Sequence, residues 1–201
     1  EAWHQFKNAE PKGEGGAAWP GAGVDSMRGS LLGPEFSEAE IRQALEAHGA
    51  VFEQVDEAAM LERAAELLAN GAVLGWFQGR MEFGPRALGS RSILGDARLA
   101  SMQSAINQKV KFRESFRPFA PAVLEERAGE YFDLTAESPY MLLVADVAKS
   151  QRLARPADES AGFARLKYAR STLPAVTHVD GSARVQTVGR ERHPLFWRLL
   201  K

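Results

Sequence analysis

A basic segment in the middle of this chain constrains its structure more than any other feature. Between Gly79 and Pro118 the sequence has eight Arg and Lys residues and three carboxylates, a local charge of +5. The 201-residue chain carries −1 in total, so the remainder sums to −6. Because a concentrated positive field on a near-neutral protein usually attracts an anion, we expect this segment to bind one.

Glycine, proline and serine are interleaved with these basic residues. Glycine lets backbone amides approach an anion closely, and Pro85 stiffens the loop that presents Arg86. Arginine binds phosphate or carboxylate bidentately, so several arginines on loops around one cavity can hold a polyanion such as ATP or an acyl phosphate. The segment matches neither the GxxxxGK[ST] phosphate loop nor the GxGxxG dinucleotide fingerprint. Composition alone therefore supports an anion site and leaves a solvated charged face as the alternative.

The remaining composition is typical of a globular protein. Hydrophobic residues make up 45% and charged residues 25% of the chain, and no apolar run approaches the roughly 20 residues of a membrane span. The chain has no cysteine, which excludes disulfides and thiolate metal sites and fits a cytoplasmic protein. Its four histidines form no HxxH or HExxH pair, so we expect no protein metal site.

Hydrophobic periodicity predicts an α/β fold of the α+β type. Residues 8–34 are rich in Gly, Pro and Ala and are expected to form an extended connection. Ser37 followed by Glu40 is a capping box that begins a helix ending near His48. A second helix is expected from Glu57 to Ala69, capped by Asp56 and closed by Asn70 and Gly71, with Ala58, Leu61, Ala65 and Leu68 on its apolar face.

Strands are expected on both sides of the basic segment. Residues 72–77 (AVLGWF) read as a buried strand that ends where the segment starts. A helix follows, with Met102, Ala105, Ile106 and Val110 on its apolar face and Lys109 and Lys111 at or beyond its end. Further elements are a strand over 119–124, a helix over 125–132, a strand over 139–147, a hairpin of AVTHVD with SARVQTV, and a final helix from Pro194.

Three blocks of this sequence resemble the C-terminal domain of the O-carbamoyltransferase family. They are GRMEFGPRALGSRSILGDAR, INQKVKFRESFRPFAP and THVDGSARVQTV, which occur in the family's order and span most of residues 72–190. The resemblance implies a linker and junction helix over 1–55 and a YrdC-like domain over 56–201, truncated at its C-terminus. That fold is an open, twisted, mixed sheet with flanking helices and a positively charged cavity.

The resemblance also implies a reaction. Carbamoyl phosphate and ATP, with Mg²⁺ held through the ATP phosphates, would form carbamoyl adenylate. An N-terminal domain of the actin-like ATPase superfamily, absent from this chain, would then transfer the carbamoyl group to a hydroxyl acceptor. Motif matching assigns the phosphates to Arg86, Lys111, Arg117 and Arg184 first, to Arg80, Arg91 and Arg113 second, and to His178 and Asp180 third.

Two other functions remain open at this stage. The same fold serves threonylcarbamoyl-adenylate synthases, although the Arg-Ala-Leu-Gly-Ser-Arg block favours the O-carbamoyltransferases. A noncatalytic nucleic-acid-binding module could also use the basic segment, but the charge of −6 elsewhere disfavours broad contact with a phosphate backbone. His178 and Asp180, taken as an isolated pattern, are equally typical of a structural turn.

Overall fold

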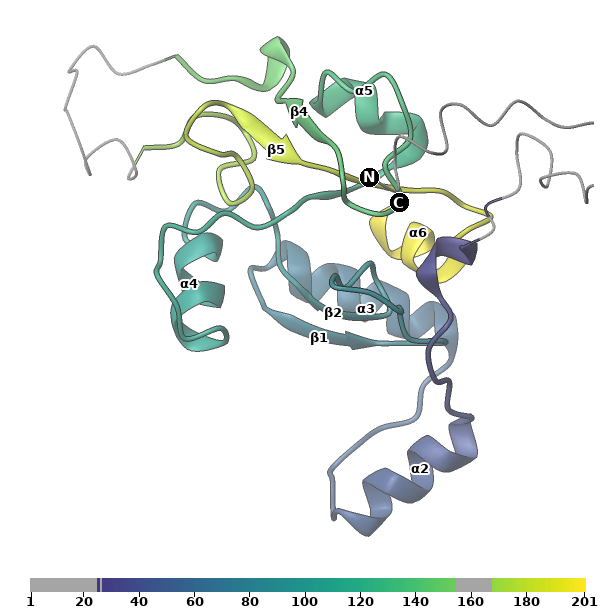
Figure 1. Cartoon of the computed structure of the whole chain (residues 1–201). Helices are drawn as coiled ribbons and strands as arrows, with labels where there is room; N and C mark the ends of the chain where they lie inside the picture. The colour runs from purple at the N-terminus through teal and green to yellow at the C-terminus, as the bar shows by residue number, and fades with distance from the viewer. Residues whose placement is uncertain (1–24, 26, 155–167) are drawn as a thin grey trace, which may run out of the picture.

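The computed structural model describes residues 25, 27–154 and 168–201. Short helices surround three two-stranded sheets, which confirms the α+β class (Figure 1). The α-helices are α2 (Glu38–Ala47), α3 (Glu57–Ala69), α4 (Met102–Lys109), α5 (Ala128–Tyr131) and α6 (Pro194–Leu200), and the 3-10 helices are η1 (Arg28–Ser30), η2 (Glu125–Arg127) and η3 (Lys149–Gln151). The strands are β1 (Leu74–Phe77), β2 (Arg91–Leu94), β3 (Ala122–Leu124), β4 (Val144–Asp146), β5 (Ser182–Arg184) and β6 (Gln186–Val188). The extended connection predicted for 8–34 lies largely outside the described residues.

The helices begin where the capping residues predict. Ser37 and Glu40 form the reciprocal capping box of α2, with the Ser37 amide donating to Glu40 Oε2 at 2.8 Å. The Asp56 carboxylate accepts the Ala59 amide at 2.8 Å and starts α3. The helix predicted over 125–132 is confirmed as η2 followed by α5.

The predicted apolar face of α3 is confirmed at Leu61 and Leu68, which pack in the core, and wrong at Ala58 and Ala65, which are exposed. Ala64 is buried instead. The reason is that α3 packs against α6 and β1 along one narrow face. The strand predicted at 72–77 exists as β1, but Phe77 is exposed because β1 pairs with β2 alone and its outer side meets no further layer.

The predicted hairpin near the C-terminus is wrong. β5 pairs antiparallel with β4, and β6 pairs in parallel with β3, so SARVQTV serves two sheets in succession. The tight turn at Asp180 and Gly181 does exist, since the His178 amide donates to the Ser182 carbonyl at 2.8 Å. The preceding residues form no strand because the backbone of Ala175 bonds instead to Ala97 and Phe119.

The core has three parts that fix the relative positions of these sheets. The first lies between α3, α6 and the β3–β6 pair and contains Phe196, Val188 and Trp76. The second lies beneath the β4–β5 pair around Phe132 and Val147. In the third, Met102 and Ile106 of α4 pack against Ala175, which confirms two positions of the predicted apolar face, whereas the predicted position Val110 is exposed. Among the described residues, no helix combines the length and apolarity that crossing a bilayer requires.

Candidate anion site

A buried carboxylate organises the loop that carries Arg86. Glu82 is 5% exposed, and its Oε1 accepts the backbone N–H groups of Leu88 and Ser90, each at 2.7 Å, and of Arg91 at 3.3 Å. Burial alone would raise the pKa of Glu82, but these amides outweigh it and hold the pKa below its ordinary value. The loop from residue 82 to 91 therefore curls around one ionised carboxylate, with Arg86 in its middle.

The same loop is fastened to β6 and α6. Gln186 Nε2 donates to the Leu88 carbonyl at 2.7 Å, and Ser90 Oγ lies 3.2 Å from Nε2 of His193. Burial lowers the pKa of His193, which favours the neutral imidazole. Gly89 has φ +109°, and a Cβ there would lie 2.4 Å from Phe196 Cδ1, so no other residue fits this close approach.

Arg86 and Arg184 form a pair of half-buried cations. Burial, followed by the like charge of Arg86, lowers the pKa of the Arg184 guanidinium. The Nε atom of each is buried and has no hydrogen-bond partner among the described residues. Within the same residues neither guanidinium joins an ion pair, and Arg184 Nη2 meets only the weak acceptor Met141 Sδ, at 3.7 Å.

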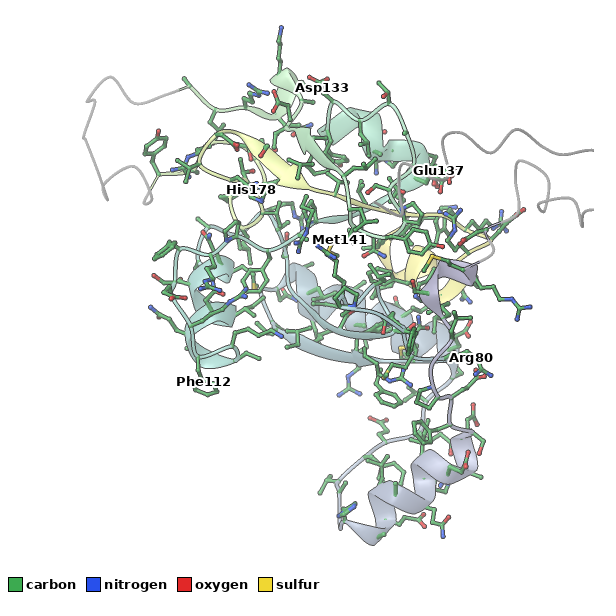
Figure 2. All side chains as sticks on the ribbon, viewed as in Figure 1. Arg80, Phe112, Asp133, Glu137, Met141 and His178 are labelled. Atoms are coloured by element: carbon green, nitrogen blue, oxygen red, sulfur yellow. The ribbon has the colours of Figure 1, made fainter. Side chains whose placement is uncertain are left out.

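The position of this pair follows from the strands. Arg184 is the last residue of β5, opposite Val144 of β4, while Arg86 comes from the loop before β2. Figure 2 shows Met141 between the β4–β5 layer and the β1–β2 layer, so its contact with Arg184 brings that guanidinium toward the space between the layers. Because a buried donor without an acceptor is costly, an anion that accepted from both guanidinium groups would remove this cost.

Arg91 and Arg80 have structural partners instead. Arg91 Nη1 donates to the carbonyls of Gln78 and Ser90 at 2.8 and 2.9 Å, Nη2 donates to the Gly79 carbonyl at 3.0 Å, and the guanidinium covers the Phe77 ring at 3.5 Å. Arg80 donates to the Gly33 carbonyl at 3.0 Å and pairs with Glu35 at 3.3 Å. Both therefore fasten the loop, and Arg80 also holds the segment before α2 against it.

The loop after α4 is a separate feature. Asn107 is fully buried and donates to the carbonyls of Ser115 and Arg117 at 3.3 and 2.7 Å, while Arg113 Nε donates to Asn107 Oδ1 at 2.6 Å. Arg117 pairs with Glu114 at 2.9 Å on the surface. Lys111 is exposed, and Phe112 beside it lies at the end of α4 away from Met141 (Figure 2). Across the described chain no contact joins Lys111, Arg113 or Arg117 to the Arg86–Arg184 pair.

His178 and Asp180 build the turn that leads into β5. Asp180 Oδ1 accepts the amide and the hydroxyl of Ser182 at 3.0 and 2.7 Å, and these bonds lower the pKa of Asp180. His178 Nδ1 lies 3.0 Å from the same hydroxyl. The two residues thus set the start of the strand that ends at Arg184.

An open cavity of about 1270 Å³ lies elsewhere, next to η2 and α6. It contains none of the residues predicted for the site, and its walls carry more carboxylates than cations. Arg192 crosses it, pairing with Asp25 and Glu137 at 3.3 Å each and with Glu125 at 3.7 Å. Among the residues that the structure describes, no group of three or more His, Cys, Asp or Glu side chains could hold a metal ion.

Sequence reasoning missed the residues that support Arg86 and Arg184. In the sequence, Glu82 was treated only as one of the three acidic residues of the basic segment. It is the only carboxylate between Arg80 and Asp96 and could have been singled out for that reason. Gln186 and Met141 carried no signal in the sequence, because their roles depend on contacts with residues 98 and 43 positions away.

Comparison with known proteins establishes the family. The family model described as the carbamoyltransferase C-terminus matches residues 65–201. This chain belongs to that family. It is 52% identical over 181 residues to the Synechocystis sp. protein sll1178, 45% identical over 174 residues to the nodulation protein NolNO of Sinorhizobium fredii, and 42% identical over 133 residues to a 3'-hydroxymethylcephem-O-carbamoyltransferase of Amycolatopsis lactamdurans.

These relatives are much longer than this chain. The matches cover 88%, 84% and 66% of the carbamoyltransferase C-terminal chain described here, but 29%, 23% and 22% of the three relatives in the same order. The chain therefore spans less than a third of each of these proteins, and the matched part corresponds to a C-terminal region.

Proposed function

We propose that this chain is the part of an O-carbamoyltransferase in which carbamoyl phosphate and ATP form carbamoyl adenylate. Family membership and the cephem O-carbamoyltransferase relative support the reaction class. The observation that carries the proposal is the Arg86–Arg184 pair, two half-buried arginines whose buried Nε atoms have no hydrogen-bond partner among the described residues. Such a pair matches a phosphate group, which offers several anionic oxygens to two forks of donors.

The proposed chemistry balances with one water molecule. Water releases inorganic phosphate from carbamoyl phosphate, and a carbamate oxygen then bonds to the α-phosphorus of ATP as the bond to pyrophosphate breaks. Arg86 and Arg184 would stabilise the charge that develops on the nonbridging phosphate oxygens, and their fixed positions reduce the reorganisation needed. Mg²⁺, when bound, would neutralise the ATP phosphates, which supply most of its ligands.

The remaining predicted ligands have one of two roles in this proposal: they contact the ATP phosphates or they hold the loops in place. Lys111 and Arg117 would reach the ATP phosphates from the loop after α4, with Arg117 exchanging Glu114 for a phosphate oxygen. Arg80, Arg91, Arg113, His178 and Asp180 would act by holding the loops that carry the first group, since each of them already has a protein partner.

Transfer of the carbamoyl group would take place in a larger, cytoplasmic protein. The length of the relatives supports a preceding region, which we propose to be a domain of the actin-like ATPase superfamily that binds the hydroxyl acceptor. Residues 1–55 would connect that domain to the YrdC-like domain over 56–201.

Calorimetric titration with MgATP, with and without carbamoyl phosphate, tests the binding role. We expect each ligand to strengthen binding of the other, and Arg184→Gln to abolish binding of both. Arg127→Gln is the matched control. Arg127 lies on the surface, where it pairs with Glu130 rather than with any residue of the proposed site. Unchanged binding by Arg184→Gln, or equal loss in the control, would exclude the pair as the phosphate site.

The salt dependence of the same binding separates this function from nucleic-acid binding. If the chain bound nucleic acid through about six backbone phosphates, its affinity would fall by orders of magnitude between roughly 50 and 200 mM salt, because each such contact releases a counterion. Binding of MgATP by two half-buried guanidinium groups involves fewer exposed phosphate contacts and should change much less. A steep loss of affinity for an oligonucleotide, with no MgATP binding, would favour the nucleic-acid function.

A further inference from the structure

The segment from Glu35 to Asp56, which we call the arm, stands apart from the rest of the molecule. It contains α2, and Figure 1 shows this helix projecting from the end of the structure that carries β1 and α3. None of the residues of α2 is buried. The arm is held by polar surface contacts, namely Arg42 with Gln54 inside it, Glu53 with Arg63 of α3 at 2.9 Å, and Glu35 with Arg80 at 3.3 Å. Exposed pairs of this kind contribute roughly 0–1 kcal/mol each.

The arm carries more apolar surface than these contacts explain. Its large hydrophobic side chains Phe36, Ile41, Val51, Phe52 and Val55 are all exposed. Ile41 and Leu45 are one helical turn apart and share a face of α2. A concentration of exposed apolar side chains on one segment marks an interaction surface, whereas scattered single ones do not.

This apolar surface continues onto the body of the molecule. The rings of Phe36 and Phe77 lie 6.2 Å apart, and Phe77 is 57% exposed on the outer side of β1. Ile93 of β2 pairs with Gly75 and is 39% exposed, so it lies on the same side of the two-stranded sheet as Phe77. One surface therefore extends from the arm across the β1–β2 pair.

The length of α2 gives an independent reason to expect a partner. The helix has 10 residues, and isolated helices shorter than about 12–15 residues are marginal in water even with good sequences. Its capping box adds about 1 kcal/mol, which does not replace the tertiary packing that stabilises most protein helices. A capped, amphipathic helix without packing partners in the described structure requires another surface to hold it.

We propose that the arm and the outer side of the β1–β2 pair dock onto an apolar groove of the preceding region of the larger carbamoyltransferase. The proposal rests on the larger protein put forward above. The choice of partner follows from the length of the relatives. The matched segment makes up only 22–29% of them, so most of each relative lies outside the part described here and could supply the groove. The arm ends at Asp56, and the family match begins at residue 65 within α3, so the arm lies where a chain coming from that region would approach the C-terminal domain.

Hydrogen exchange of the α2 amides tests this docking. One sample is the 201-residue chain, and the other joins it to the preceding region of the Synechocystis protein in place of that protein's own matched segment. We expect the α2 amides to exchange near their intrinsic rate in the chain alone and to slow by about 100-fold or more in the joined protein, as packing replaces local opening. The α3 amides should be protected in both samples and report that the body is folded.

Paired variants identify the surface. Ile41→Ser together with Val51→Ser should remove the added protection of α2, whereas Leu67→Ser, at a comparably exposed position of α3, should leave it unchanged. If the joined protein does not fold, the separately produced preceding region is added to the chain and α2 is measured again. Fast α2 exchange in the folded joined protein, or in the mixture, would overturn the proposal.

Two further results separate this proposal from its alternatives. Protection of α2 that rises with the concentration of the chain alone would overturn it in favour of contact between two copies. MgATP and carbamoyl phosphate titrations of the Ile41→Ser, Val51→Ser chain should equal those of the original chain, because the arm contacts neither Arg86 nor Arg184. Docking and ligand binding can thus fail independently.

Discussion

Arg91 and Arg184 have the same side chain and opposite surroundings. Arg91 donates to three backbone carbonyls within 3.0 Å and covers an aromatic ring, so its guanidinium is bound by other parts of the protein itself. Arg184 has a buried Nε without a partner among the described residues and the like charge of Arg86 beside it. The comparison teaches that a basic segment in a sequence does not identify a ligand site, whereas the presence or absence of protein acceptors does.

The difference has an energetic meaning. A buried guanidinium that lacks an acceptor destabilises the fold, and natural proteins retain such groups where function requires them. A guanidinium bonded to carbonyls stabilises the fold and has no donors left for a ligand. Substitutions at the two positions should therefore have opposite effects on stability and on binding.

The largest effect should come from Arg184→Met. Truncating one partner of a hydrogen-bonded charge pair costs about 2–5 kcal/mol of binding, so affinity for carbamoyl phosphate should fall by about 100-fold or more. Calorimetric titration measures this loss directly. Wild-type affinity in the variant would show that the cation lies outside the ligand site.

Glu82→Ala should give the largest loss of stability. It leaves the amides of Leu88, Ser90 and Arg91 without their acceptor, and at about 1–3 kcal/mol per buried orphan the free energy of unfolding should fall by about 3 kcal/mol. Urea unfolding provides the measurement, with Glu82→Gln as the control because its amide oxygen can still accept. Equal stability of the Ala variant would mean that the loop does not depend on this carboxylate.

Arg91→Met should weaken the fold by a smaller amount and leave binding intact. Loss of its bonds to the Gln78 and Gly79 carbonyls should lower the free energy of unfolding by about 2 kcal/mol. In the absence of urea, where the variant is still folded, the affinity of Arg91→Met for MgATP should equal that of the original chain. Loss of binding without loss of stability would reverse the roles assigned to Arg91 and Arg184.

The pH dependence of stability should show the smallest effect. His193 has a pKa lowered by burial, so its contribution is complete above the unfolded value of 6.5 and is lost as pH falls below it. We expect the original chain to lose about 1 kcal/mol more than His193→Gln between pH 7.5 and 5.5. Urea midpoints at the two pH values measure the difference, and parallel losses in both proteins would contradict a neutral buried imidazole.

Local signals in the sequence predicted local structure well. The caps of α2 and α3 act over three residues, so Ser37, Glu40 and Asp56 were sufficient to place both helix starts. Met102 and Ile106 likewise identified the buried face of α4. On α3 the leucines were placed correctly and the alanines were not, because the neighbouring elements, rather than helical periodicity alone, decide which of several alanines meets the core.

Contacts between distant residues explain what the sequence could not predict. SARVQTV alternates as a hairpin strand would, but its partners β4 and β3 come from earlier parts of the chain. The resemblance grouped nine residues as ligands, and no sequence pattern could show that Arg91 is engaged by carbonyls while the buried Nε atoms of Arg86 and Arg184 have no acceptor in the described chain. The bond between Gln186 and Leu88, which fastens the loop that carries Arg86 to β6, spans 98 positions.

The most direct test of the central claim is the free energy of unfolding of Arg184→Met without ligand, compared with the original chain by urea denaturation at pH 7.5. We expect the variant to be as stable as the original or more stable by about 1 kcal/mol, since the substitution removes a half-buried cation with an unpartnered Nε and its repulsion by Arg86. A loss of about 2 kcal/mol would contradict the account, because it would show that Arg184, like Arg91, is a structural arginine with partners of its own.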